Sequence, residues 1–175
     1  MTDYNREGRF QGQTDTPLSA EGRQQAHKVG QWLKTKQIQA LYSSDLSRAK
    51  ETAELISRAI NLKIEPYRPD LREIDFGCWE GHTLAEVARL YPEQLARWRS
   101  DRTYLAPHGG ETFAQLAARG WQALKEIAAS NPGRKVAVVT HGGLIKAALC
   151  LAHGLGFQRR SEFTVDNTAV NTIRL

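Results

Sequence analysis

Two short segments of the sequence combine cationic or protonatable side chains with the features of an anion-binding turn. In Tyr42–Arg48, a strand-like run passes into a helix whose first turn holds Arg48. In Val139–Gly143, His141 stands at the end of an apolar run and is followed by two glycines. The N–H groups at a helix N-terminus favour an anion, and a guanidinium grips a phosphate group with two hydrogen bonds. Together the two segments predict a phosphate-binding site.

Both segments also have an ordinary structural interpretation. Arg48 would then be exposed to solvent or paired with a nearby carboxylate, that of Asp45 or Glu51. His141 would only satisfy the hydrogen bonds of a turn. The spacing alone does not decide between the two interpretations.

A third segment, Leu71–Gly81, contains an acid that could transfer protons. Apolar and aromatic residues surround Glu73 in the sequence, and they would raise its pKa and fit it to donate a proton at neutral pH. The alternative is an exposed Glu73 that pairs with Arg72. From spacing alone, this alternative is the better interpretation.

The apolar periodicity predicts that helices and strands alternate along the chain and position these segments. Ser19 stands where it would cap the first helix, and Val136–Val139 is a continuous apolar run, typical of a strand buried on both faces. Such alternation predicts a three-layer α/β/α sandwich with a mainly parallel sheet, which binds ligands beyond the carboxyl ends of its strands. The predicted helices are Leu18–Lys36, Leu46–Ile60, Thr83–Leu90, Glu93–Arg99, Thr112–Ser130 and Leu144–Leu155, and the predicted strands are Ile38–Ser43, Lys63–Tyr67, Val136–Val139 and Thr168–Leu175.

The composition is that of a globular domain with a basic surface. The formal charge of +5 suits an anionic partner. The basic residues are scattered among acids, so a small phosphorylated substrate is a better candidate than nucleic acid. No apolar run of membrane-spanning length and no secretory leader pattern occurs, which predicts no membrane partner and a cytoplasmic protein. The two cysteines, Cys78 and Cys150, have neither a disulfide nor a metal-binding spacing. A homodimer is left open.

Taken in order, several motifs that cover nearly the whole chain resemble those of the histidine phosphatase superfamily (phosphoglycerate-mutase-like). Each motif is modest alone, and the set is specific. The matching segments are Gly8-Arg9-Phe10-Gln11-Gly12, Asp15-Thr16-Pro17-Leu18-Ser19 with Gly22, Ser43-Ser44-Asp45-Leu46-Ser47-Arg48-Ala49, Leu71-Arg72-Glu73 with Gly77 and Trp79-Glu80-Gly81, Gly110-Glu111-Thr112, and Val139-Thr140-His141-Gly142-Gly143.

The resemblance implies a phosphomonoesterase that works through a phosphohistidine, without a metal or an organic cofactor. Arg48 and His141 would bind the phosphoryl group and stabilise it during its transfer. Glu73 would protonate the leaving oxygen and later activate water. The remaining residues implied to line the phosphate pocket are Asn5, Gln11, Gly12 and Gly142.

One element of the family pattern is absent from these 175 residues. The family's nucleophile is the histidine of an Arg-His-Gly motif at the end of the first, central strand, and by the resemblance Met1 falls one position after that glycine. The other histidines lie in the wrong context to replace it: His27, His82, His108 and His153. We therefore expect a single histidine phosphatase domain over residues 1–175 that is truncated at the N-terminus, and also at the C-terminus, and that lacks its first central strand. A chain without the nucleophile should hydrolyse no phosphomonoester.

Several functions stay open. The leading one is hydrolysis of a small phosphorylated metabolite, and a phosphoglycerate mutase or an α-ribazole-phosphate phosphatase would use the same groups. The middle of the chain is short for a mutase, which usually carries longer insertions over its substrate. From another class, a catalytically dead phosphate-binding module would keep Arg48 and His141 as an anion site without a covalent intermediate. A nucleic-acid-binding role fits least.

Overall fold

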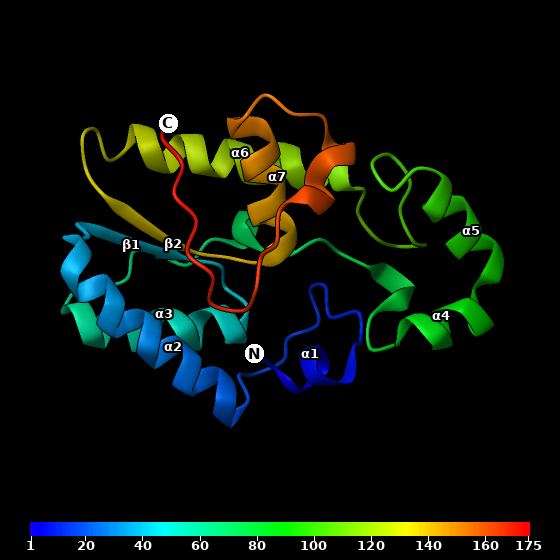
Figure 1. The fold of residues 1–175 in the computed structure, drawn as a ribbon, viewed down its shortest axis with the longest axis horizontal. Helices are drawn as coiled ribbons and strands as arrows, with labels where there is room; N and C mark the ends of the chain where they lie inside the picture. The colour runs from blue at the N-terminus through cyan, green and yellow to red at the C-terminus, as the bar shows by residue number, and fades with distance from the viewer.

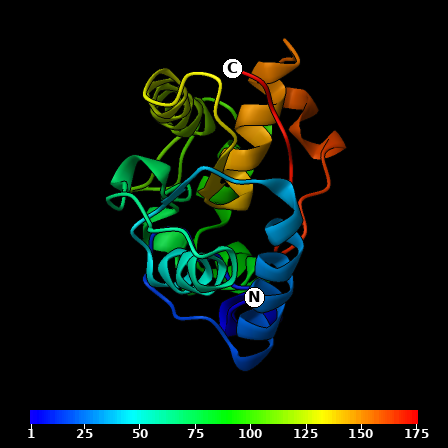
Figure 2. The ribbon, with the colours of Figure 1, turned by 90° about the vertical axis from the view of Figure 1, so that its left-hand side faces the viewer.

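A short parallel sheet lies at the centre of the computed structural model, which describes residues 1–175 (Figure 1). Strand β1 (Ala40–Ser43) pairs with β2 (Val136–Val139), with Ala40 opposite Val136 and Ser43 opposite Val139. Helices α2 (Ala20–Leu33) and α3 (Ser47–Ile60) lie on one face of the sheet, and α6 (Phe113–Ala129) and α7 (Gly142–Ala152) lie on the other (Figures 1 and 2). The predicted α/β/α sandwich is confirmed.

Helices make up most of the remaining chain. The α-helices are α1 (Asp3–Glu7), α2 (Ala20–Leu33), α3 (Ser47–Ile60), α4 (Leu84–Leu90), α5 (Pro92–Ser100), α6 (Phe113–Ala129) and α7 (Gly142–Ala152), and the 3-10 helices are η1 (Lys34–Lys36), η2 (Pro69–Leu71), η3 (Gly77–Trp79) and η4 (Phe157–Glu162). The helices predicted from periodicity all occur, with ends shifted by up to three residues. Ser19 caps α2 as predicted, because its side chain accepts a hydrogen bond from the backbone of Gly22. The predictions missed α1, η2, η3 and η4. None of these helices combines the length and apolar character needed to span a membrane.

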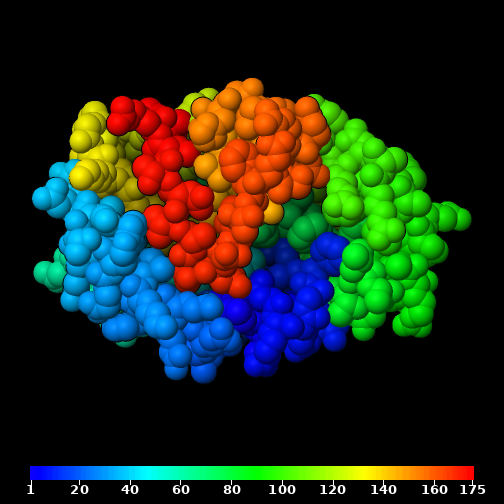
Figure 3. All heavy atoms as spheres, in the orientation of Figure 1, coloured from blue at the N-terminus to red at the C-terminus, as the bar shows by residue number.

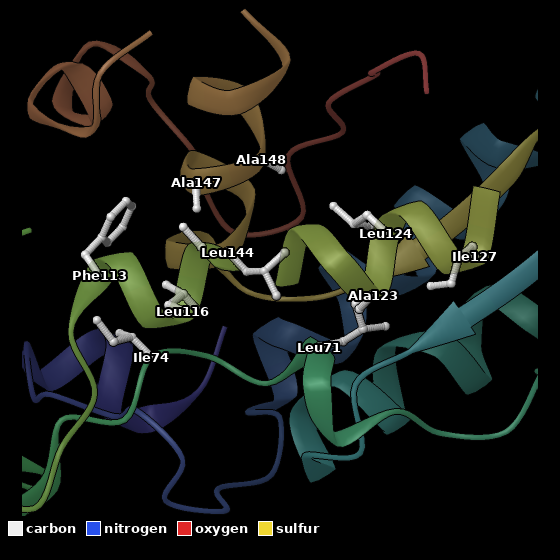
Figure 4. Close-up of a cluster of buried hydrophobic side chains, with 11 residues drawn as sticks. Leu71, Ile74, Phe113, Leu116, Ala123, Leu124, Ile127, Leu144, Ala147 and Ala148 are labelled. Carbon is white, nitrogen blue, oxygen red and sulfur yellow. The ribbon is translucent and has the colours of Figure 1, made fainter. Parts of the chain in front are cut away.

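The alternation of side chains in the two strands explains the three layers. Leu41, Ala137 and Val139 pack against α2 and α3, whereas Tyr42, Val136 and Val138 face α6 and α7. The larger apolar cluster is on the second side, where α6 lies against α7 (Figure 4). Its buried members are Leu71, Ile74, Phe113, Leu116, Ala117, Ala123, Leu124, Ile127, Leu144, Ala147 and Ala148.

A glycine sets how closely α6 and α7 approach. A Cβ atom on Gly120 would lie 2.7 Å from the side chain of Leu144, which is well inside the contact distance of two carbon atoms. The N-terminus of α7 follows the carboxyl end of β2 after two residues, so it lies at the carboxyl edge of the sheet. This N-terminus carries part of the site described below.

Two predicted strands are wrong. Thr168–Leu175 forms no strand, because the structure places no strand beside it to supply ladder hydrogen bonds. Lys63–Tyr67 runs beside β1 but makes only an isolated parallel bridge, between Leu41 and Ile64. In Figure 3 the C-terminal segment (red) lies on the surface between α2 (light blue) and the orange residues of α7 and η4.

Val136–Val139 packs against helices on both faces, as predicted, but the strand is not fully buried. All four residues of β2 are only half-buried. The reason is that the edge of β2 opposite β1 has no partner strand, and this edge lines a large cavity together with residues 165–175. The strand is apolar enough for full burial, but nothing covers its second edge.

Candidate active site

The carboxyl ends of β1 and β2 bring two functional turns side by side. β1 leads through Ser44 into α3, whose first turn holds Arg48, and β2 leads through His141 into α7. Because Ser43 and Val139 are partners in the parallel ladder, both turns leave the sheet at the same edge. The Nε2 atom of His141 lies 2.9 Å from the hydroxyl of Ser44, so a hydrogen bond links the two turns.

Arg48 is buried and anchors a third segment to this edge. Its Nη1 donates to the carbonyl of Thr14 at 2.9 Å and its Nη2 to the carbonyl of Gly12 at 2.6 Å. Burial lowers the pKa of its guanidinium, while the carboxylates of Glu73, Asp15 and Glu80 oppose that shift, and an arginine keeps its charge in any case. The site therefore contains a fixed positive charge.

The alternative partners considered for Arg48 are engaged elsewhere. Asp45 accepts two hydrogen bonds from Arg72, at 2.7 and 2.6 Å, and Glu51 accepts from Arg23 at 3.1 Å. The interpretation of Arg48 as an exposed or carboxylate-paired residue is wrong. Because Asp45 occupies Arg72, the predicted pairing of Glu73 with Arg72 is wrong as well.

His141 is 8% exposed, and such burial favours the neutral form of its imidazole. Burial lowers its pKa well below the usual value, and the positive charges of Arg48 and Arg119 lower it further. A neutral imidazole has one N–H donor and one acceptor nitrogen. With Nε2 bonded to Ser44, the other ring nitrogen is available to a ligand.

The carboxylate of Glu73 lies at the N-terminus of α7. Its Oε1 accepts a hydrogen bond from the backbone of Ile74 at 2.9 Å, and its Oε2 accepts from the backbone of Gly143 at 3.0 Å. A Cβ on Gly143 would lie 2.2 Å from Oε1, so the second glycine of the motif is needed for this contact. An acid in this position is held by backbone groups of two separate segments and not by a cation.

The segment before α2 contributes two amides. The side-chain oxygen of Gln11 accepts hydrogen bonds from the hydroxyls of Thr2 and Thr16, and that of Asn5 accepts from the backbone of Thr2. Each amide thus uses its oxygen within the protein and leaves its NH₂ donors for another partner. Donor groups of this kind suit an anion.

All seven predicted site residues line a single cavity of about 1480 Å³. The cavity is large because it continues from the carboxyl edge along the unpaired edge of β2 to residues 165–175. Of the five histidines in the chain, His141 alone lines it. The residues that meet here are Asn5, Gln11, Gly12, Arg48, Glu73, His141 and Gly142.

Sequence reasoning missed two residues that hold the site together. Ser44 bonds His141, and Glu80 accepts four hydrogen bonds, from the backbones of Gln13, Thr14 and Phe76 and from the Thr14 hydroxyl, at 2.5 to 3.1 Å. Glu80 thereby fixes the loop whose carbonyls bind Arg48. Both residues stood inside recognised motifs, and that position was the only signal in the sequence.

Comparison with known proteins places this site in context. A sequence model described as "Histidine phosphatase superfamily (branch 1)" matches residues 1–175. The chain is 41% identical to glucosyl-3-phosphoglycerate phosphatase of Mycobacterium tuberculosis over 157 residues, which cover 84% of this chain and 69% of that protein. It is 40% identical to metal-independent phosphoserine phosphatase of Arabidopsis thaliana over 176 residues, which cover 99% of this chain and 72% of that protein. The crystal structure of α-ribazole phosphatase from Shigella flexneri matches with a TM-score of 0.87 at 25% identity, over 95% of this chain and 82% of that one.

Proposed function

Because this chain belongs to the histidine phosphatase superfamily (branch 1), we propose that it hydrolyses the phosphate ester of a small phosphorylated metabolite through a phosphohistidine intermediate. The relatives named above are phosphatases, which makes this chain a phosphatase too. The observation that carries the mechanism is that Arg48, His141 and Glu73 line one cavity at the carboxyl edge of the sheet.

In this proposal Arg48 and His141 bind the phosphoryl group. Phosphoryl transfer needs fixed positive charge and donors directed at the equatorial oxygens. Arg48 uses two of its five N–H donors on the loop at Gly12 and Thr14, so the others can face the phosphate. His141 donates its remaining N–H, and the NH₂ groups of Asn5 and Gln11 and the backbone N–H of Gly142 add further donors.

Glu73 is proposed to move the proton. When the nucleophilic histidine attacks phosphorus, the ester P–O bond breaks and the leaving oxygen takes a proton from the Glu73 carboxyl. Water then attacks the phosphohistidine, the Glu73 carboxylate takes the proton of that water, and inorganic phosphate leaves. The histidine is regenerated, so each cycle returns both groups to their starting state.

We propose that the nucleophilic histidine is not among residues 1–175. No Arg-His-Gly occurs in them, and His141 is the only histidine on the cavity. The support for its location is the unpaired edge of β2, whose N–H and C=O groups face a cavity with apolar walls and would pair with one more strand. A histidine at the end of such a strand would reach the turns that hold Arg48 and His141. Residues 1–175 alone would then hydrolyse no phosphomonoester.

The substrate is proposed only as a class, a small metabolite with a phosphate ester. The relatives are named for three different substrates, a glucosylated phosphoglycerate, phosphoserine and α-ribazole phosphate. A phosphoglycerate mutase is the enzymatic alternative, and a phosphate-binding module without turnover is the alternative from another class. A panel of phosphate esters, assayed in parallel for hydrolysis and for mutase turnover, separates these.

Two experiments test the proposal. Residues 1–175 should bind inorganic phosphate, and Arg48→Ala should abolish that binding, while p-nitrophenyl phosphate stays intact. Turnover by residues 1–175 that disappears with Arg48→Ala would overturn the location of the nucleophile. The chain extended by a strand that ends in Arg-His-Gly should turn over phosphate esters and, quenched during reaction with ³²P-labelled substrate, yield acid-labile labelled phosphohistidine. Turnover of that form without labelled protein would overturn the covalent mechanism.

A further inference from the structure

The segment that carries Glu73 has no regular secondary structure of its own. After η2 ends at Leu71, residues 72–76 belong to no helix or strand. A carboxylate on such a segment keeps a fixed position only if other groups hold the backbone. The structure supplies these groups from α6, from the turn before it, from Gln13, whose amide donates to the carbonyl of Glu73 at 3.4 Å, and from Glu80, which accepts from the N–H of Phe76 at 3.1 Å.

Arg119 on α6 holds the backbone immediately before and at Glu73. Its Nη1 donates to the carbonyls of Asp70 and Arg72, at 3.0 and 2.8 Å, and its Nη2 donates to the carbonyl of Glu73 at 2.8 Å. Its Nε and Nη2 bind the carboxylate of Glu111, at 2.7 and 2.8 Å. These five bonds use all five N–H donors of a guanidinium. A lysine ammonium has three donors and cannot reproduce the set.

Glu111 holds the backbone on the other side of Glu73. Its backbone N–H donates to the carbonyl of Asp75 at 2.8 Å, and its Oε2 accepts from the N–H of Asp75 at 3.4 Å. The side chains of Glu111 and Arg119 are 14% and 24% exposed, so the pair is largely shielded from water. The Arg119–Glu111 ion pair therefore holds the backbone on both sides of Glu73, from residue 70 to residue 75.

We propose that Arg119 and Glu111 are positioning residues that hold the carboxylate of Glu73 against the N-terminus of α7. The proposal rests on the proposed function only for the role of Glu73 as proton donor. The geometry itself is independent of that role. Neither side chain of the pair contacts the reacting groups, and both act through the backbone of residues 70–75.

The backbone amide of Gly143 offers a direct readout of this geometry. It donates to Oε2 of Glu73 at 3.0 Å, so its NMR resonance should move when Glu73 gains a proton. In residues 1–175, Glu73→Gln should abolish this pH-dependent shift and so assign it. Arg119→Lys and Glu111→Gln should lose most of it, because Glu73 moves away from the amide.

Arg68→Lys is the matched control. Arg68 also forms an ion pair with an acid of α6, Glu126, and binds Asp70, but it makes no hydrogen bond to the carbonyls of residues 70–73. Its variant should keep the Gly143 shift. Should Arg119→Lys fail to fold, Glu111→Gln, which keeps the arginine, still decides. A wild-type Gly143 titration in the folded positioning variants would overturn the proposal.

A kinetic measurement distinguishes the positioning role of Arg119 and Glu111 from the proposed role of Glu73 as proton donor. A proton donor matters more for an alkoxide leaving group than for the weakly basic p-nitrophenolate. In the extended form that turns over esters, Arg119→Lys should lower kcat for an alkyl phosphate about 10- to 100-fold and affect p-nitrophenyl phosphate far less. If Glu73→Gln changes neither rate while the Gly143 shift still depends on Arg119, the assignment of the proton donor fails and the positioning role stands.

Discussion

The two glycines that follow His141 make a sharp prediction, because the structure gives them opposite surroundings. A Cβ added to Gly143 would lie 2.2 Å from Oε1 of Glu73 and 3.2 Å from a methyl group of Leu116. A Cβ added to Gly142 would meet nothing nearer than Oε2 of Glu73, at 4.0 Å. Each alanine variant adds one methyl group, and the two positions are adjacent in the chain.

The expected energies follow from these distances. In Gly143→Ala the carboxylate must move by about 1 Å and gives up its bonds to Ile74 and Gly143, which should destabilise the fold by about 1–3 kcal/mol. In Gly142→Ala the helix loses a flexible residue without a clash, which should stabilise it by up to about 0.5 kcal/mol. Urea unfolding followed by circular dichroism should separate the two midpoints by about 1 M.

A double-mutant cycle isolates the cause. In a Glu73→Ala background the clashing carboxylate is gone, so Gly143→Ala should lose most of its destabilising effect and only the contact with Leu116 should remain. If the two substitutions add without coupling, or if Gly143→Ala is as stable as Gly142→Ala, the placement of Glu73 at the N-terminus of α7 is refuted.

Three further outcomes are expected. Arg48→Lys should weaken inorganic phosphate binding by about 10- to 100-fold in isothermal titration, because an ammonium group cannot bind two loop carbonyls and a ligand with the fork geometry of arginine. Because folding lowers the pKa of His141, the unfolded chain binds more protons than the folded one below pH 6.5. The free energy of unfolding should therefore fall by up to about 1.4 kcal/mol for each pH unit below that value. His141→Gln should remove this pH dependence in urea titrations at several pH values. Ser44→Ala should destabilise the fold by about 1–3 kcal/mol in the same assay, because it leaves a buried ring nitrogen of His141 without its hydrogen-bond partner. Ser47 is the control, since its hydroxyl bonds Asp15 at an exposed site, and Ser47→Ala should destabilise the fold by less than about 1 kcal/mol.

The elements that the sequence predicted well are those with a strong local pattern. Helices α2, α3 and α6 each bury a periodic apolar face, and β2 is a continuous apolar run between clear stop signals. Thr168–Leu175 has an alternating pattern too, but a strand also needs a neighbour, and neighbours are set by topology. The half-burial of β2 has the same origin, because the pattern of one strand cannot show which of its edges is covered.

The charged groups of the site could be identified from sequence, but their partners could not. The spacing suggested Asp45 or Glu51 for Arg48 and Arg72 for Glu73, and all of these pairings are wrong. The real partners are main-chain groups, which have no signature in the sequence. An ion pair between neighbours in the chain is a local event, whereas these contacts form only when distant segments meet.

This difference explains how the charged groups of the site are held in place. Arg48 binds two carbonyls and Glu73 binds two amides, so backbone dipoles and not opposite charges occupy the nearest positions around these two groups. Arg119 binds three carbonyls and also pairs with the carboxylate of Glu111. A backbone dipole orients a charge without neutralising it, so Arg48 keeps its positive charge in the cavity. Burial lowers the pKa of His141, and the charge of Arg48 lowers it further. A phosphoryl group that enters the cavity would meet the positive charge of Arg48 in a fixed geometry. This is the electrostatic preorganisation that transfer of a phosphoryl group requires.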